Sequence, residues 1–176
     1  TISDNYVYGA TFFFMGSLAA IAHVLSTNIA LIPYHSLLLS PNKLSIKNYT
    51  RIIRRGLSTS FLLVIVLILT FLSIPDNYFP DGITKDLNIF VMLLITSQFV
   101  VMNSFFSLRM YAAKVDNLLL KISVLEFVLR IGSVTTLIAM NLFNFIPIVM
   151  MGLAVFMLIT RIYFYKKFVK IDDYSL

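Results

Sequence analysis

The chain has 176 residues, of which 59% are hydrophobic and 12% are charged, and its mean hydropathy is +0.90. Soluble domains are about 45–50% apolar and about 25% charged, so this composition excludes an ordinary soluble domain and predicts an integral membrane protein. The absence of cysteine excludes disulfides and thiolate metal sites. The net charge of +6 does not indicate nucleic-acid binding, because the basic residues gather in connections between apolar runs.

The first apolar run covers about residues 6–33, which is longer than the roughly 20 residues that a membrane span requires. Within it, Gly16, Ala20, His23 and Thr27 fall on one helical face, and small residues at this spacing predict close helix packing. His23 is a candidate cavity residue. Two interpretations stay open for it, a hydrogen-bonded packing histidine or a group that couples transport to protons.

The connection at residues 34–56 holds five cations and no acidic residue. These candidate membrane-surface residues are Lys43, Lys47, Arg51, Arg54 and Arg55. Apolar residues lie among them at helical spacing. This pattern predicts either an amphipathic helix on the membrane surface or the charged beginning of the next span.

The second and third apolar runs cover about residues 57–74 and 88–111, with a short acidic turn between them. The second run is nearly free of polar groups and predicts a lipid-facing helix. The third run carries Gln98 and Asn103 and ends at Arg109, near the headgroups. We take these three polar residues as further candidates for a cavity.

The fourth run, at about residues 118–141, contains Glu126 and Arg130. Charges within hydrocarbon are rarely left without a partner or a water-filled cavity, and the i,i+4 spacing allows these two to pair. Ser123 and Ser133 share their helical face. Two interpretations stay open: a self-neutralised structural pair between packed helices, or a polar stripe that lines a transport cavity.

The fifth run covers about residues 146–165 and is closed by the cations Arg161, Lys166, Lys167 and Lys170. The four connections and the C-terminal region hold, in chain order, five, one, three, none and four lysines and arginines. Regions rich in these cations thus alternate with regions that are poor in them. The positive-inside rule therefore predicts that residues 34–56 and the C-terminus are cytoplasmic and that the N-terminus lies outside. An outside N-terminus without a signal-peptide pattern leads us to expect a preceding helix, and thus a fragment.

The order of these features resembles a known group of transporters. A long span ends in Ile32-Pro33, a basic stretch contains Lys47-Asn48-Tyr49 and Arg54-Arg55, the next span closes at Pro75, and the last ends in Tyr163-Phe164-Tyr165-Lys166-Lys167. Over nearly its whole length the chain resembles the C-terminal half of the polysaccharide-transporter branch of the MOP flippases. This branch includes the flippases for lipid-linked O-antigen and capsule oligosaccharides. The match is one of pattern and order rather than of a short signature.

The resemblance implies an all-α fold in which five membrane helices belong to a twelve-helix transporter of two bundles with a central cavity. It implies a substrate oligosaccharide on undecaprenyl pyrophosphate, moved to the periplasmic leaflet of the bacterial inner membrane. Membrane lipids, the missing N-terminal helices and the polysaccharide polymerase machinery are the implied partners. Arg130 would be the best cation for the pyrophosphate, although Glu126 one turn away would neutralise it. No cofactor and no metal are implied.

Two rival functions remain. A cation-coupled multidrug antiporter of the same fold would use Glu126 as its cavity carboxylate, and a membrane subunit without a transport role would use the pair for packing alone. A membrane-embedded enzyme is disfavoured, because His23 and His35 are the only histidines and no two carboxylates stand at helical spacing in a span.

Overall fold

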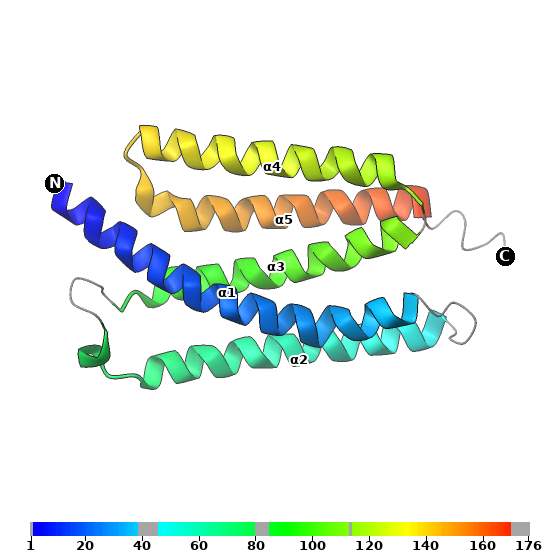
Figure 1. Cartoon of the computed structure of the whole chain (residues 1–176), viewed down its shortest axis with the longest axis horizontal. Coiled ribbons are helices and arrows are strands. Elements are labelled where there is room, and N and C mark those ends of the chain that lie inside the picture. Colours follow the sequence, from blue (N-terminus) through cyan, green and yellow to red (C-terminus); the bar gives the residue numbers. More distant parts are fainter. Residues whose placement is uncertain (1, 39–45, 80–84, 113, 170–176) are drawn as a thin grey trace.

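The computed structural model describes residues 2–38, 46–79, 85–112 and 114–169, and these residues form helices and turns without any strand. Their five α-helices are α1 (Ile2–Leu38), α2 (Ile46–Ser73), α3 (Leu87–Ala112), α4 (Asp116–Ala139) and α5 (Ile146–Phe164). Two 3₁₀ turns, η1 (Asp76–Tyr78) and η2 (Phe143–Phe145), precede α3 and α5, and a π-helical turn, η3 (Tyr165–Val169), continues α5. The predicted all-α fold is confirmed (Figure 1).

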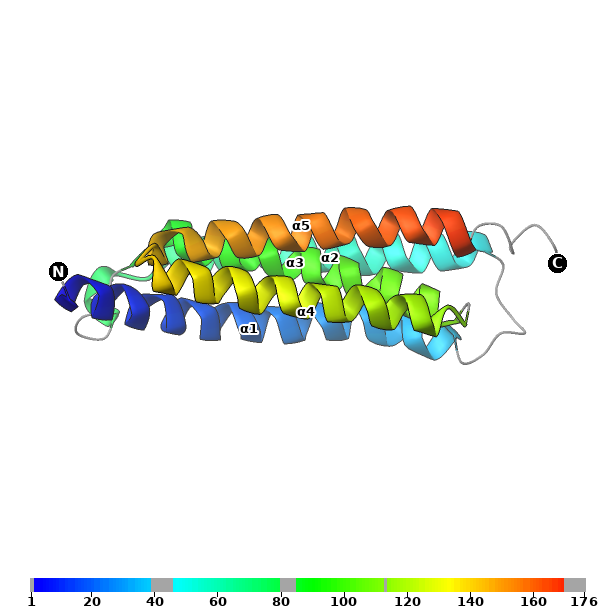
Figure 2. The same cartoon turned by 90° about the horizontal axis from the view of Figure 1, so that it is seen from above.

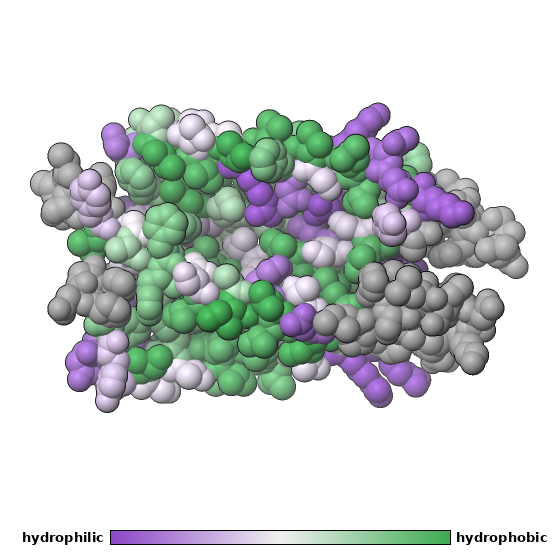
Figure 3. All heavy atoms as spheres, viewed as in Figure 1, coloured by the Kyte–Doolittle hydropathy of each residue, from purple (hydrophilic) through white to green (hydrophobic). Residues whose placement is uncertain are grey.

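Among the described residues, five helical segments are long and apolar enough to cross a membrane: Tyr6–Leu31, Arg54–Ser73, Leu87–Tyr111, Asp116–Ala139 and Phe143–Phe168. Connections alternate between the two ends of the bundle, so α1, α3 and α5 run in one direction and α2 and α4 in the other (Figures 1 and 2). Hydrophobic side chains cover much of the middle of the molecule, while hydrophilic ones gather towards its ends (Figure 3). The chain is a multi-pass membrane bundle.

The basic connection is largely helical. α1 continues to Leu38 and α2 already begins at Ile46, so Lys47, Arg51 and the Arg54-Arg55 pair lie on the first turns of α2. Of the two sequence interpretations, the structure therefore agrees with a charged beginning of the next span rather than a separate surface helix. Lys43 lies outside the described residues.

The helix α3 is the centre of the bundle, because it contacts α1, α2, α4 and α5. Its residues Leu94, Val101 and Met110 are fully buried. Leu94 belongs to an apolar cluster with residues of α1 and α2, whereas Met110 packs with Ile122 of α4 and Met157 of α5. The packing thus divides into an α1–α2–α3 half and an α3–α4–α5 half that share α3.

The face of α1 that packs against its neighbours differs from the one predicted. The buried residues are Met15, Ala19, Ala22, Ser26 and Ala30, one position before the predicted stripe. Within that stripe Ala20 is exposed, and a Cβ on Gly16 would meet nothing within 4 Å. Close packing by small residues does occur on α1, but through the adjacent stripe, since both stripes carry small side chains and periodicity does not choose between them.

The helices α1 and α2 approach closely at Gly56, where an added Cβ would lie 3.0 Å from the Ala30 Cα. We expect Gly56→Leu to force the two helices apart and to lower the free energy of unfolding by about 1–3 kcal/mol, as overpacking does. Gly132→Leu on α4 is the matched control, because nothing lies within 4 Å of a Cβ there and the gain in helix propensity is the same. Circular dichroism during SDS titration in mixed micelles measures the free energy of unfolding of both variants. Equal stability of the two variants would contradict the close contact.

Both ends of α4 are fixed by turns of the same type. At Lys114 (φ 56°), the Lys114 N–H donates to the Tyr111 carbonyl at 2.9 Å and the Val115 N–H to the Met110 carbonyl at 3.1 Å. At Asn141 (φ 57°), the next N–H reaches back to the Leu137 carbonyl at 2.8 Å. These are Schellman-type helix ends, which satisfy the last carbonyls and reverse the chain within a few residues. They hold α4 antiparallel to α3 and α5.

Candidate functional site

Glu126 of α4 is the centre of an ion cluster with one arginine from its own helix and one from α5. Its Oε1 accepts hydrogen bonds from Arg130 Nε at 3.1 Å and Arg130 Nη2 at 2.7 Å. Its Oε2 accepts a hydrogen bond from Arg161 Nη2 at 2.7 Å. The predicted pairing of Glu126 with Arg130 is therefore present, and a second cation joins it.

The cluster carries more positive than negative charge, and its side chains are largely shielded from solvent. The side chains of Glu126, Arg130 and Arg161 are exposed by 16%, 24% and 7%. Two guanidinium groups share one carboxylate, so the formal charge of the cluster is positive. Coulombic interactions are stronger in such a setting than in water, and the surplus charge attracts an anion.

The local structure explains how the three side chains meet. Glu126 and Arg130 lie one turn apart on α4 and extend along the same face, with Arg130 near the middle of that helix. Arg161 lies in the last turn of α5, on the buried face that also carries Ala154, Met157 and Leu158. Since α4 and α5 are antiparallel neighbours, the end of α5 reaches the first half of α4 (Figure 1).

Arg161 is the member of the cluster that the sequence did not predict. From the sequence, Arg161 is one of several cations that close the fifth span. A signal was present, because Arg161 precedes the Lys166-Lys167 pair by more than one turn and apolar residues flank it. In the structure it is 6% exposed and it packs between the two helices.

The cluster retains hydrogen-bond donors. A guanidinium has five N–H groups, and the buried Nε of Arg161 has no partner among the described residues. Donors of this geometry match phosphate and carboxylate oxygens. No three side chains of His, Cys, Asp or Glu gather in the described part of the chain.

A second polar group lies in the other half of the bundle, around Gln98 of α3. Gln98 Oε1 accepts a hydrogen bond from Ser60 Oγ of α2 at 2.5 Å, and Gln98 Nε2 donates to Ser26 Oγ of α1 at 3.0 Å. All three residues are buried. Gln98, one of the candidate cavity residues, thus bridges three helices.

We expect Gln98→Leu to weaken the α1–α2–α3 half by leaving both serine hydroxyls without this partner. Hydrogen bonds between membrane helices contribute on average about 0.6 kcal/mol and at most about 1.7. Two lost bonds therefore predict a loss of about 1–3 kcal/mol in the free energy of unfolding. SDS titration of Gln98→Leu, of Ser26→Ala with Ser60→Ala, and of all three combined checks this. If the bridge exists, the triple variant is hardly less stable than Gln98→Leu; additive losses would contradict it.

The remaining candidates are Asn103, Arg109 and His23. Asn103 of α3 is 2% exposed and donates from Nδ2 to the Ala154 carbonyl of α5 at 3.1 Å, which ties these helices together. Arg109 stacks on the Tyr165 ring with its Cζ 4.8 Å from the ring centroid. His23 is half-buried on α1, and its Nδ1 has no partner among the described residues.

The structure thus separates the predicted residues into two groups. The described residues of α1 make no contact with α4 or α5, so His23 and the Gln98 bridge are not joined to Glu126 and Arg130. Within the described part of the chain, the ion cluster is the only ion pairing that joins charged groups from two spans. Comparison of the chain with protein-family models, with curated proteins and with solved structures finds no match in any of the three.

Proposed function

We propose that the chain is part of a membrane flippase that moves a lipid-linked oligosaccharide on a pyrophosphate carrier for the synthesis of surface polysaccharide. The ion cluster of Glu126, Arg130 and Arg161 carries this proposal. It places more guanidinium than carboxylate charge on two membrane-spanning helices. An anion that enters the membrane loses its hydration, and these guanidinium groups would compensate for that loss. A pyrophosphate offers several oxygens to the free donors.

The arrangement of Glu126 disfavours the antiporter alternative. A carboxylate that binds a cationic drug or a coupling proton needs an accessible oxygen. Both oxygens of Glu126 accept hydrogen bonds from guanidinium groups. In this arrangement Glu126 orients the two arginines, and the arginines are left to bind the substrate.

We also propose the orientation with the α1–α2 connection in the cytoplasm of a bacterial inner membrane. The residues Arg51, Arg54 and Arg55 are exposed on the first three turns of α2. The anionic cytoplasmic leaflet attracts basic residues at such a position. Reporter fusions after Asn48 and after Asp81 are expected to give cytoplasmic and periplasmic signals, respectively. A periplasmic signal at Asn48 would contradict the orientation.

A flippase cavity of this type lies between two bundles, so we propose that the chain supplies five of twelve helices and does not transport alone. The test uses the complete product of the gene that encodes this chain, reconstituted in vesicles. We expect it to translocate a fluorescent undecaprenyl-pyrophosphate oligosaccharide and to leave a labelled organic cation behind. The chain of 176 residues by itself is the matched control and is expected to be inactive. Transport of the organic cation alone would reject the proposal in favour of the antiporter.

A further inference from the structure

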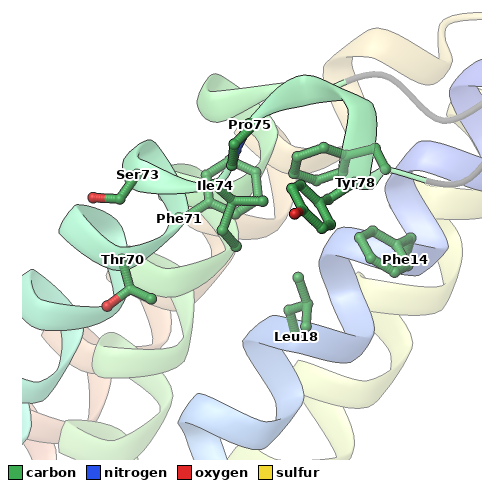
Figure 4. A pocket seen from close by; sticks show the side chains of 9 residues that line it. Phe14, Leu18, Thr70, Phe71, Ser73, Ile74, Pro75 and Tyr78 are labelled. Carbon is green, nitrogen blue, oxygen red and sulfur yellow. The ribbon is translucent and has the colours of Figure 1, made fainter.

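An apolar cleft lies at the end of the bundle where α2 ends. Its volume is about 690 Å³, within the range of about 300–1,000 Å³ typical of ligand sites. Figure 4 shows Phe14 and Leu18 of α1 on one side of the space, Phe71 of α2 and Ile74 just after it on the other, and Tyr78 of η1 above them. The rest of the lining is Thr70, Ser73, Pro75 and Phe79.

The helix arrangement explains why the cleft is there. α1 and α2 touch closely at Ala30 and Gly56, and then diverge towards the N-terminal end of α1, which reaches η2 instead (Figure 1). The chain turns back over the resulting gap at η1. Lys85 fixes this turn, because its Nζ donates to the Ile74 carbonyl at 2.5 Å and the Leu72 carbonyl at 3.3 Å.

The polar groups of the cleft are already satisfied. Thr70 Oγ1 donates to the Val66 carbonyl and Ser73 Oγ to the Leu69 carbonyl, each at 2.9 Å. Their hydroxyls turn away from the space in Figure 4. Apart from the rim hydroxyl of Tyr78, nothing polar in the lining requires water or a polar ligand. An apolar cavity of this kind does not hold ordered water.

The surroundings of the cleft are those of the bilayer. It lies beside the last residues of the spanning segment Arg54–Ser73, and its neighbours Phe13, Leu69 and Leu72 are exposed apolar side chains. Tyr78 at the rim is 75% exposed and Asp76 beside it is also exposed, as expected at headgroup level. The bulk component present at this depth is phospholipid.

From this geometry we infer that the cleft between α1 and α2 binds one acyl chain of a phospholipid from the leaflet at this end of the bundle. The acyl chain fills the gap between Phe14, Leu18 and Ile74, and the ring of Tyr78 covers the acyl chain at the headgroup side. The bound chain replaces the missing contact between the two diverging helices. This site is independent of the proposed transport function.

The absence of tryptophan and cysteine from the chain makes a direct test possible. Phe14→Trp places a fluorophore in the lining of the cleft. Phe13→Trp is the matched control, because Phe13 is the neighbouring residue of the same type and is 76% exposed on the outer face. Both variants are reconstituted with phospholipid brominated along its acyl chains, which quenches tryptophan on contact, and are then diluted into detergent with unbrominated lipid.

We expect Phe14→Trp to keep most of its quenching after dilution, while Phe13→Trp loses most of it because the surrounding lipid exchanges. Adding Leu18→Phe to Phe14→Trp narrows the cleft and should abolish the retained quenching. Equal recovery of fluorescence in both reporters, or retained quenching with Leu18→Phe, would overturn the inference. Release of the brominated chain by a stoichiometric amount of a polyprenyl phosphate, but not by phospholipid, would also overturn it, because the occupant would then be an isoprenoid.

Discussion

Glu126→Gln is expected to be the most destabilising change in the ion cluster. Glutamine keeps the size of the side chain but removes the only negative charge that the described residues supply to the cluster, so Arg130 and Arg161 lose their counterion. Removing one partner from a buried ion pair costs about 3–5 kcal/mol. We expect a loss of this size in the free energy of unfolding, measured by circular dichroism during SDS titration, together with a reduced amount of protein in the membrane.

Combined variants separate this explanation from a general effect of the substitution. Glu126→Gln with Arg130→Met still leaves Arg161 without a counterion and is expected to recover little stability. Adding Arg161→Met removes every charge of the cluster and is expected to recover most of it, since apolar replacements of buried ion clusters are often neutral. Wild-type stability of Glu126→Gln alone would show that the arginines reach water instead.

Arg161→Met is expected to have the largest effect on transport relative to its effect on folding. The change leaves the neutral pair of Glu126 and Arg130 with both of its hydrogen bonds. The variant loses one hydrogen bond to a charged group, which lowers the free energy of unfolding by about 1.5–3 kcal/mol at most, because the helices remain packed. The surplus positive charge disappears, however, and with it the proposed contact to the pyrophosphate.

A lost contact of about 1.4 kcal/mol or more corresponds to an apparent affinity at least about tenfold weaker. We therefore expect Arg161→Met to raise the substrate KM by this factor or more in the vesicle assay of the complete protein, normalised to folded protein. Arg161→Lys keeps the charge without the fork of donors and is expected to restore part of the affinity. Unchanged transport per folded molecule would reduce the cluster to a packing element.

Hydropathy predicted the five spans well, because the cost of exposing polar groups to hydrocarbon acts on the sequence directly. It did not predict that α1 continues to Leu38 or that α2 begins at Ile46. Backbone hydrogen bonds extend a helix beyond the membrane wherever the sequence permits, and hydropathy does not report them. The i,i+4 spacing predicted the pair of Glu126 and Arg130 for a similar reason, since both lie on one helix.

Contacts between helices were harder to predict. Arg161 joins Glu126, and Gln98 joins Ser26 and Ser60, because of how each helix is rotated about its axis. Periodicity defines the faces of a helix but not the neighbour that each face meets. On α1 the predicted packing stripe is shifted by one residue from the buried stripe, because both stripes contain small side chains.

The division of the ion cluster between α4 and α5 has a consequence for the order of insertion during synthesis. α4 is made first, and Glu126 and Arg130 neutralise each other within this helix, so neither of them enters the membrane as an unpaired charge. α5 follows with Arg161, whose partner lies on another helix. A lone arginine at the centre of a membrane helix costs about 2.5–3.5 kcal/mol at the translocon and less towards its end, and Glu126 is already in place as a partner for Arg161. If α5 preceded α4 in the gene, Arg161 would enter the membrane before its counterion Glu126 was present.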